Sequence, residues 1–255
     1  MARKVELVGL ETLPEVAPGD DLASLIVEAA EREGVSLDNG DILLISQKVV
    51  SKAEGRFIDL RGVSPSEEAL RLSRYLGKSP EEVEVILKES DEILKVEGGA
   101  LIVRSKQGIV CANAGVDKSN VSSEGRKLLL LPEDPDSSSE RIRRRIYELT
   151  GKLVGVVITD TQGRPLREGQ INVAVGLSGV TPLKDYRGKR DRSGYVLKVK
   201  KIAVADELAS AGELIMGQSD EGIPVVVVKG LSWMLTSEKV SAKSLVMPDN
   251  RWLFR

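Results

Sequence analysis

The sequence of 255 residues predicts an α+β fold, because stretches typical of helices and of strands alternate irregularly and not as a regular βαβ array. Apolar residues make up 41% and charged residues 30% of the chain, which is typical of a globular protein with a substantial core. Aromatic residues contribute only 3%, so the core is expected to consist mainly of aliphatic side chains. We expect a single domain over residues 1–255, in which residues 131–136 can mark a boundary between two subdomains.

The N-terminal elements follow from apolar spacing and from helix-capping residues. Residues 22–33 have the spacing of an amphipathic helix, and Asp20 and Asp21 are available to cap it. Residues 41–50 have a strongly apolar centre, Ile-Leu-Leu-Ile, and are therefore predicted to form a strand.

Two capping boxes predict the next two helices. Ser64–Glu67 and Ser79–Glu82 each combine a serine, a proline at the first helical position and a glutamate at the third. Gly77 is expected to end the first of these helices. Residues 101–110 then predict either a pair of short strands or one bent strand.

The second half of the chain begins with a Pro-rich acidic loop at residues 131–136. A helix is predicted at residues 137–150, ending before Gly151. Residues 153–159 are almost continuously apolar and predict a buried strand.

Four more elements complete the prediction. Residues 171–177 and 195–204 are expected to be strands, and the alternating lysines of the latter indicate one solvated face. Residues 205–216 predict a helix, and residues 223–228 predict a final apolar strand.

The composition excludes several kinds of site. The chain has no histidine, which rules out a Ser-His-Asp or Cys-His nucleophile and a histidine general base. A metal would have to be held by oxygen atoms, which favours magnesium or manganese. The single cysteine, Cys111, cannot form a disulfide within the chain, which fits a cytoplasmic protein. We expect its side chain to be buried and to serve in packing. The net charge of −2 and the lack of a long apolar run predict no nucleic-acid partner and no membrane partner.

Two polar segments in the first half of the chain lie where binding groups are often found, next to apolar strands. Residues 46–56 combine lysines, an arginine and serines, which can hold phosphates or a carboxylate; the alternative is a solvated strand end. Residues 113–120 offer several oxygen ligands around Gly115, although a turn with side-chain hydrogen bonds uses the same residue types.

Two further polar segments lie in the second half. In residues 159–165, Asp160 follows a buried strand directly, and its carboxylate with two hydroxyls can bind a divalent ion that bridges phosphates, while Arg164 neutralises charge. The alternative is a simple turn before Gly163. Residues 217–224 resemble half of a phosphate-binding loop, but the lysine of a P-loop is missing and the segment follows a helix instead of a strand.

The remaining conspicuous residues have structural interpretations. Four arginines between residues 141 and 145 are expected to form an exposed helix face. Trp233 and Trp252 are expected to be packing or interface residues and not a stacking platform.

Taken together, the polar segments resemble the coenzyme F420-0:L-glutamate ligase family, often called CofE. One segment alone would be weak, whereas five in the order of the family are specific. Thr12 stands where some members have glycine, and residues 231–255 match no pattern of the family. The matching stretches are Leu13-Pro14 with Pro18-Gly19-Asp20-Asp21-Leu22, then Ser51–Arg56, Asn113–Asn120, Ile158–Arg164 and Met216–Pro224.

This resemblance implies a homodimer of intertwined α+β subunits, each with two interleaved mixed subdomains. It also implies GTP as co-substrate, two divalent magnesium or manganese ions, and a potassium ion. On matching positions, Asp117 and Asp160 would bind the first metal, and Thr161 and Gln218 would contribute to a second ion. Asp160, Arg164 and Lys52 are expected to carry the catalysis. The expected nucleotide contacts are Leu13, Pro14, Glu15, Val16, Gln47, Lys52, Asn120, Gly217, Gln218, Ser219, Asp220, Glu221 and Gly222.

The reaction that the resemblance implies is amide formation through an acyl phosphate, with L-glutamate added to the lactyl carboxylate of coenzyme F420-0 to give F420-1 and F420-2. Three alternatives stay open: a related amide ligase for another carboxylate, a metal-dependent phosphohydrolase, and a non-catalytic nucleotide-binding regulator. The motifs do not distinguish GTP from ATP. Arg56, Arg164 and Arg167 are candidates, on charge alone, for binding the deazaflavin or the glutamate.

Overall fold

A central five-stranded mixed sheet organises the computed structural model, which describes residues 4–118 and 126–253. Its order is β1-β12-β2-β8-β9; β2 and β8 are parallel, and the other neighbours are antiparallel. Helices and several sheets are mixed along the chain, in agreement with the predicted α+β class. The strands are β1 (Glu6–Leu10), β2 (Ile42–Ser46), β8 (Gly155–Gln162), β9 (Ile171–Ser178) and β12 (Val225–Lys229).

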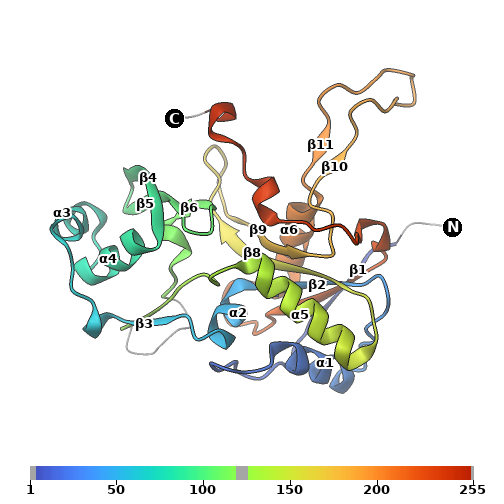
Figure 1. Ribbon diagram of the computed structural model, residues 1–255, viewed down its shortest axis with the longest axis horizontal. Helices are drawn as coiled ribbons and strands as arrows, with labels where there is room; N and C mark the ends of the chain where they lie inside the picture. Colours follow the sequence, from blue (N-terminus) through green and yellow to red (C-terminus); the bar gives the residue numbers. More distant parts are fainter. Residues whose placement is uncertain (1–3, 119–125, 254–255) are drawn as a thin grey trace.

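Helices cover both faces of this sheet (Figure 1). Helices α1 (Leu22–Arg32) and α5 (Pro135–Thr150) pack on one face, and α6 (Val204–Met216) packs on the other. In β2, Leu43 and Ile45 point to the first face while their neighbours point to the second, so every position from 42 to 45 is fully buried. A strand covered on both sides must be apolar throughout, which explains its sequence.

The strand predicted at residues 41–50 is wrong in its second half. It ends at Ser46, and Gln47–Ala53 form helix α2. Strands β12 and β8 pair with β2 only as far as Ile45 and Ser46, so the backbone beyond must satisfy its hydrogen bonds within a helix. Short apolar runs do not distinguish the two states.

A second group of elements, inserted between α2 and α5, builds a smaller core of its own. It contains a three-stranded sheet of order β4-β5-β6 and a two-stranded sheet of β3 and β7. The pair of strands predicted within residues 101–110 is confirmed as β5 and β6, but the long strand β4 was missed. The elements are β3 (Phe57–Asp59), η1 (Leu60–Gly62), α3 (Glu67–Leu76), α4 (Pro80–Lys88), β4 (Ser90–Glu97), β5 (Ala100–Ser105), β6 (Val110–Ala112), η2 (Asn113–Gly115) and β7 (Lys127–Leu129).

One of the two predicted capping boxes is correct. Ser79 caps α4, accepting a hydrogen bond from the Glu82 N–H, and Gly77 ends α3 in a left-handed conformation, as predicted. The box beginning at Ser64 is wrong, because Ser66 is the N-cap of α3. Glu84 of α4 accepts hydrogen bonds from both the N–H and the hydroxyl of Ser66, which holds this residue at the helix start.

Helix α5 begins at Pro135, two residues before its predicted start, and Asp134 is its N-cap. The segment expected as a loop at residues 131–136 therefore ends within the first turn of a helix. Here the chain returns from β7 to the central sheet, and the division into two subdomains at this point stays a prediction.

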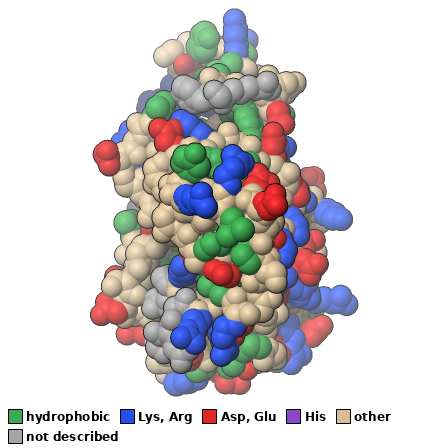
Figure 2. Space-filling view, turned by 90° about the vertical axis from the view of Figure 1, so that its left-hand side faces the viewer, with side chains coloured by type: hydrophobic (Ala, Val, Ile, Leu, Met, Phe, Trp, Pro, Cys, Tyr) green, Lys and Arg blue, Asp and Glu red, His purple; other side chains and the backbone are tan. Residues whose placement is uncertain are grey.

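Figure 2 shows that positive and negative side chains are interspersed over the outer face of the second group of elements, with small apolar groups between them.

The strand predicted at residues 195–204 is wrong. Only Lys201–Ile202 of this range form a strand, β11, which pairs with β10 (Lys184–Asp185). The residues between them form a projecting hairpin whose arms are joined by an isolated bridge between Arg190 and Val196 (Figure 1). Val199 is 88% exposed, so the alternation of valine and lysine does not reflect a buried face.

The C-terminal residues form three short 3-10 helices, η3 (Ser232–Met234), η4 (Ala242–Leu245) and η5 (Asp249–Arg251). No helix in the described part of the chain has the length and apolar character needed to span a membrane.

Candidate functional site

A cavity of about 2150 Å³ lies at the carboxyl ends of β2 and β8. Because these two strands are parallel, the segments that follow them emerge side by side, which is where ligands bind in many mixed sheets. Every described residue that was expected to be catalytic, to bind the nucleotide or to bind a metal lines this cavity, whereas Asn120 lies outside the described residues. The lining includes Leu13, Pro14, Glu15, Val16, Gln47, Lys52, Asp117, Asp160, Thr161, Arg164, Gly217, Gln218, Ser219, Asp220, Glu221 and Gly222.

Two carboxyl groups, Asp117 and Asp160, dominate the electrostatics of the cavity. Burial raises the pKa of Asp160 to about 7, and the nearby charge of Asp117 adds to the rise, while a backbone hydrogen bond from Thr161 and the charge of Lys48 oppose it. Lys48 forms an ion pair with Asp117, with 2.8 Å between Nζ and Oδ2. A carboxyl group whose pKa is raised by burial and by a second carboxylate nearby is typical of a functional site.

The donor set fits a hard divalent cation that shares its coordination with a ligand. Among residues 4–118 and 126–253, no group of three or more histidine, cysteine, aspartate or glutamate side chains could enclose a metal. Magnesium is commonly bound by one or two carboxylates together with phosphate oxygens and water. Asp117 and Asp160 can supply the two carboxylates. Cys111 is buried and its thiol stays neutral, because burial and the charge of Asp160 raise its pKa to about 12.

The turn that presents Asp117 has an unusual backbone. Asn113, Ala114 and Gly115 all have positive φ, of 53°, 55° and 68°. This conformation is unfavourable for residues other than glycine and is often found at functional sites. Two contacts stabilise it here: the Asn113 side chain accepts a hydrogen bond from the Leu101 N–H at 3.1 Å, and Ala114 is buried in the smaller core.

Thr161 and Gln218, which were predicted to share an ion, are in contact. The Gln218 amide donates to the Thr161 hydroxyl at 3.0 Å and to Glu213 at 2.8 Å. The Thr161 hydroxyl also lies 2.8 Å from Oδ1 of Asn172. Asn172 and Glu213 were missed by the sequence interpretation, because they lie inside a predicted strand and a predicted helix, where a polar residue is not distinctive.

The nucleotide segments also meet in the cavity. Lys52 is 8% exposed and forms an ion pair with Glu15, which joins α2 to the loop after β1. In the loop after α6, the Glu221 carboxylate accepts a hydrogen bond from the Ser219 N–H, which lowers its pKa. Gly217 has φ 66° and ψ −173°, a backbone conformation that essentially only glycine adopts, so this loop requires glycine there.

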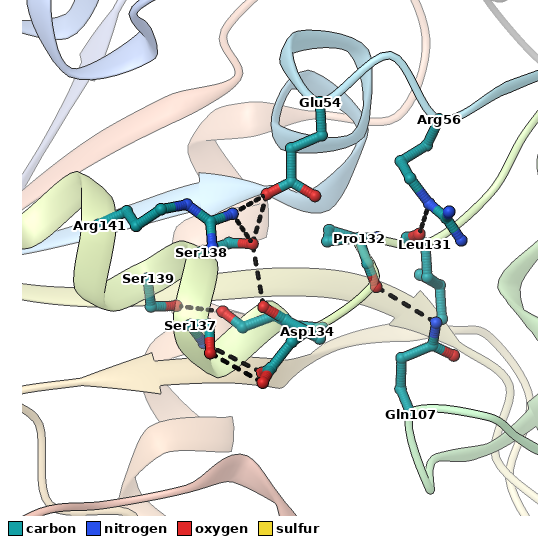
Figure 3. A network of polar contacts seen from close by, with 11 residues as sticks. Glu54, Arg56, Gln107, Leu131, Pro132, Asp134, Ser137, Ser138, Ser139 and Arg141 are labelled. Atoms are coloured by element: carbon teal, nitrogen blue, oxygen red, sulfur yellow. Dashed lines mark hydrogen bonds and ion pairs between the residues drawn. The ribbon is translucent and has the colours of Figure 1, made fainter.

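The arginine candidates separate into two groups. Arg164 lines the cavity, but its guanidinium donates to backbone carbonyls of Glu168 and Gly169, so it also holds its own loop. Arg56 and Arg167 do not line the cavity; Arg56 Nε donates to the Leu131 carbonyl at 3.0 Å (Figure 3). The Arg56 guanidinium also forms an ion pair with Glu89, so it has structural contacts on two sides, and its role in substrate binding stays a prediction.

Glu54, which belongs to one of the matching stretches, is structural. Its carboxylate accepts hydrogen bonds from Ser138 and Arg141, each at 2.5 Å, and so connects the end of α2 to the start of α5 (Figure 3). Asp134 caps the same helix by accepting from the Ser137 N–H at 3.0 Å. These contacts fix the direction in which α2 presents Lys52 to the cavity.

Comparison with known proteins agrees with this arrangement. Residues 11–230 match the model of the F420-0:Gamma-glutamyl ligase family. The coenzyme F420:L-glutamate ligase of Methanopyrus kandleri is 48% identical over 99% of this chain and 97% of its own length. The enzyme of the same name from Methanothermobacter thermautotrophicus is 45% identical over 98% of this chain and 99% of its own length. The chain therefore belongs to the F420-0:gamma-glutamyl ligase family.

Proposed function

We propose that this protein is a GTP-dependent ligase that adds L-glutamate to the lactyl carboxylate of coenzyme F420-0 and releases GDP and phosphate. The first product is F420-1, and a second addition by γ-linkage gives F420-2. The observation that carries the proposal is that a single cavity brings the Asp117–Asp160 pair together with the loops at residues 13–16 and 217–222 in a member of this family.

The proposed reaction has two displacements. An oxygen of the lactyl carboxylate attacks the γ-phosphorus of GTP, the bond to the bridging oxygen of the β-phosphate breaks, and GDP leaves. The amino nitrogen of glutamate then attacks the acyl carbon and loses its proton, and phosphate leaves. Such a reaction depends mainly on positioning and on neutralising oxygen charge, so the absence of histidine from the chain is no obstacle.

The residues of the cavity can divide this work. Asp117 and Asp160 would hold a divalent magnesium or manganese ion, and Thr161 with Gln218 would contribute to a second ion. Bound metal neutralises charge on phosphate oxygens during transfer. Lys52, released from Glu15, supplies a positive charge for the nucleotide phosphates, and Gln47 lines the wall beside it. Arg164 shapes the loop at residues 163–169 through its backbone hydrogen bonds.

Two properties of the assembly belong to the same proposal. We expect a cytoplasmic homodimer, as the likeness of the motifs to the family implies. Residues of both cores line the cavity of one chain.

The deciding experiment measures phosphate release with GTP and manganese, in the presence of coenzyme F420-0, with and without L-glutamate, followed by mass analysis of the coenzyme. Release that requires both substrates, with a coenzyme heavier by one or two glutamyl units, supports the ligase. Replacing GTP with ATP in the same assay tests the nucleotide preference. Phosphate release without glutamyl transfer would indicate a phosphohydrolase or another acceptor, and nucleotide binding without release would indicate a regulator.

A further inference from the structure

The C-terminal residues 241–253, which we call the strap, line the same cavity although they lie beyond the matched family segment. The strap is attached at its start to α5 and β9. The Asp136 carboxylate accepts hydrogen bonds from the Ser241 hydroxyl at 2.6 Å, from the Ala242 N–H at 3.0 Å and from the Leu177 N–H at 2.8 Å. The strap is therefore a defined wall of the cavity and not a loose tail.

The far end of the strap is attached to the smaller core. Arg104 of β5 donates to Asp249 at 2.7 Å, and its guanidinium carbon lies 5.4 Å from the centroid of the Trp252 ring. The indole N–H of Trp252 donates to the Met247 carbonyl at 2.7 Å. These contacts hold the only aromatic side chain of the strap's described part in one orientation, with its ring half-buried in the cavity wall.

Apolar side chains that are partly or largely exposed also line the cavity. Met247 and Leu253 of the strap are 46% and 83% exposed, and Ile93 of β4 is 37% exposed. Together with Trp252 they place apolar side chains in the wall of the cavity that Asp117 and Asp160 also line. Ligand sites that combine an aromatic wall with a few charges bind planar conjugated rings well.

The aromatic end of the strap and the loop at residues 13–16 are held by different parts of the fold. Residues 13–16 follow β1 at one edge of the central sheet, whereas Trp252 contacts Arg104 of β5 in the smaller core. Asp160 on β8 lines the same cavity. A ligase must bring the acceptor carboxylate to the γ-phosphate, so the remainder of the acceptor extends away from the nucleotide.

We propose that Trp252 and the adjoining apolar residues of the strap bind the planar conjugated ring of the acceptor, which is the deazaflavin if the function proposed above is correct. In this arrangement the ring packs against the indole, and the phosphodiester side chain leads the carboxylate toward Asp160. Trp252 is a specificity-determining residue that contacts the acceptor far from the reacting atoms. This proposal replaces the expectation from the sequence that Trp252 is not a stacking platform.

The test compares four forms of the full-length protein: wild type, Trp252→Ala, Trp252→Phe and the control Trp233→Ala. Trp233 is the only other tryptophan; it lies beside Lys184, with 3.6 Å from Nζ to its ring centroid, and it does not line the cavity. The Kd of coenzyme F420-0 is measured by equilibrium dialysis without nucleotide, and KM values for F420-0 and GTP are measured by product formation. Circular dichroism verifies that each variant is folded.

We expect Trp252→Ala to raise the Kd and KM for F420-0 about tenfold, with the KM for GTP and kcat nearly unchanged. Trp252→Phe should recover most of the affinity, and Trp233→Ala should match wild type. Equal F420-0 affinity in all four forms, or a raised KM for GTP in Trp252→Ala, would overturn the inference. If wild type forms no glutamylated product but Trp252→Ala alone loses F420-0 binding, the ligase proposal fails and this inference stands.

Discussion

At the scale of single residues, the Asp160 carboxyl group has the most unusual surroundings of the predicted metal ligands. It follows a fully buried stretch of β8, so its carboxyl is placed where solvation is poor and where Asp117 lies close. Burial and a like charge both disfavour the ionised form, and a divalent cation removes both penalties. The same features predict that replacing this residue by its neutral amide impairs the function.

We expect Asp160→Asn to reduce kcat by about 10²- to 10³-fold, because the amide has no charge with which to hold a metal. The melting temperature should be unchanged or slightly higher, since an uncharged group is easier to bury. Asp185→Asn, on the projecting hairpin, is the matched control and should retain full activity. Near-normal turnover of Asp160→Asn would rule out the metal assignment.

The raised pKa of Asp160 also predicts how metal binding depends on pH. Below about pH 7 the metal-free carboxyl is protonated and must lose its proton before it can coordinate, whereas above this pH it is already ionised. The apparent manganese affinity, measured by calorimetry, should therefore fall about tenfold per pH unit below pH 7 and level off above it. A flat profile between pH 5.5 and about 8 would show that this carboxyl does not limit binding.

At the scale of elements, the serine that matches the capping motif of α3 is not the serine that caps the helix. Ser66 both caps the helix and hydrogen-bonds to Glu84, whereas Ser64 makes neither contact among the described residues. Ser66→Ala should lower the free energy of unfolding by about 1–2 kcal/mol, and Ser64→Ala should change it by less than about 0.5 kcal/mol. Urea denaturation of both variants would measure the difference, and equal effects would contradict this account.

The contact between α5 and β9 gives a second prediction at this scale. A Cβ on Gly176 of β9 would lie 2.5 Å from the backbone oxygen of Pro135, so an alanine there must push the start of α5 away from the sheet. Gly176→Ala should cost about 1–3 kcal/mol of stability in urea denaturation. Gly62→Ala, where a Cβ meets nothing within 4 Å, is the control and should be close to neutral. A neutral Gly176→Ala would mean that α5 and β9 separate at no cost.

At the scale of the whole molecule, residues of the central sheet and of the inserted smaller core line the same cavity. Its walls come from the loop after β1, the ends of β2 and β8, the inserted strands and the strap. We expect a homodimer, so light scattering after gel filtration should give about twice the chain mass of 27.6 kDa. A mass of one chain at micromolar concentration would contradict the dimer but leave the cavity residues unchanged.

The sequence by itself determined the type of fold and the chemistry available to the site. The lack of histidine and the polar segments after apolar strands led to oxygen ligands around Asp160, and all the described residues predicted from the motifs line one cavity. This succeeded because apolar strand cores and the loops that follow them are local features. Helices α1, α4 and α6 were likewise predictable within a few residues, since capping and apolar spacing are local too.

Only the tertiary structure decided which distant residues meet. Helix α2 looked like a continuing strand, and the valine–lysine alternation near Val199 looked like a strand with one wet face. Apolar spacing shows that apolar and polar residues alternate along a segment. Whether the segment forms a strand also depends on whether a neighbouring strand lies close enough to form backbone hydrogen bonds with it. Asn172 joined the site, and Trp252 reached the cavity, through contacts across many residues of sequence. Such contacts arise from packing the sheet and its helices together, so no local pattern in the chain encodes them.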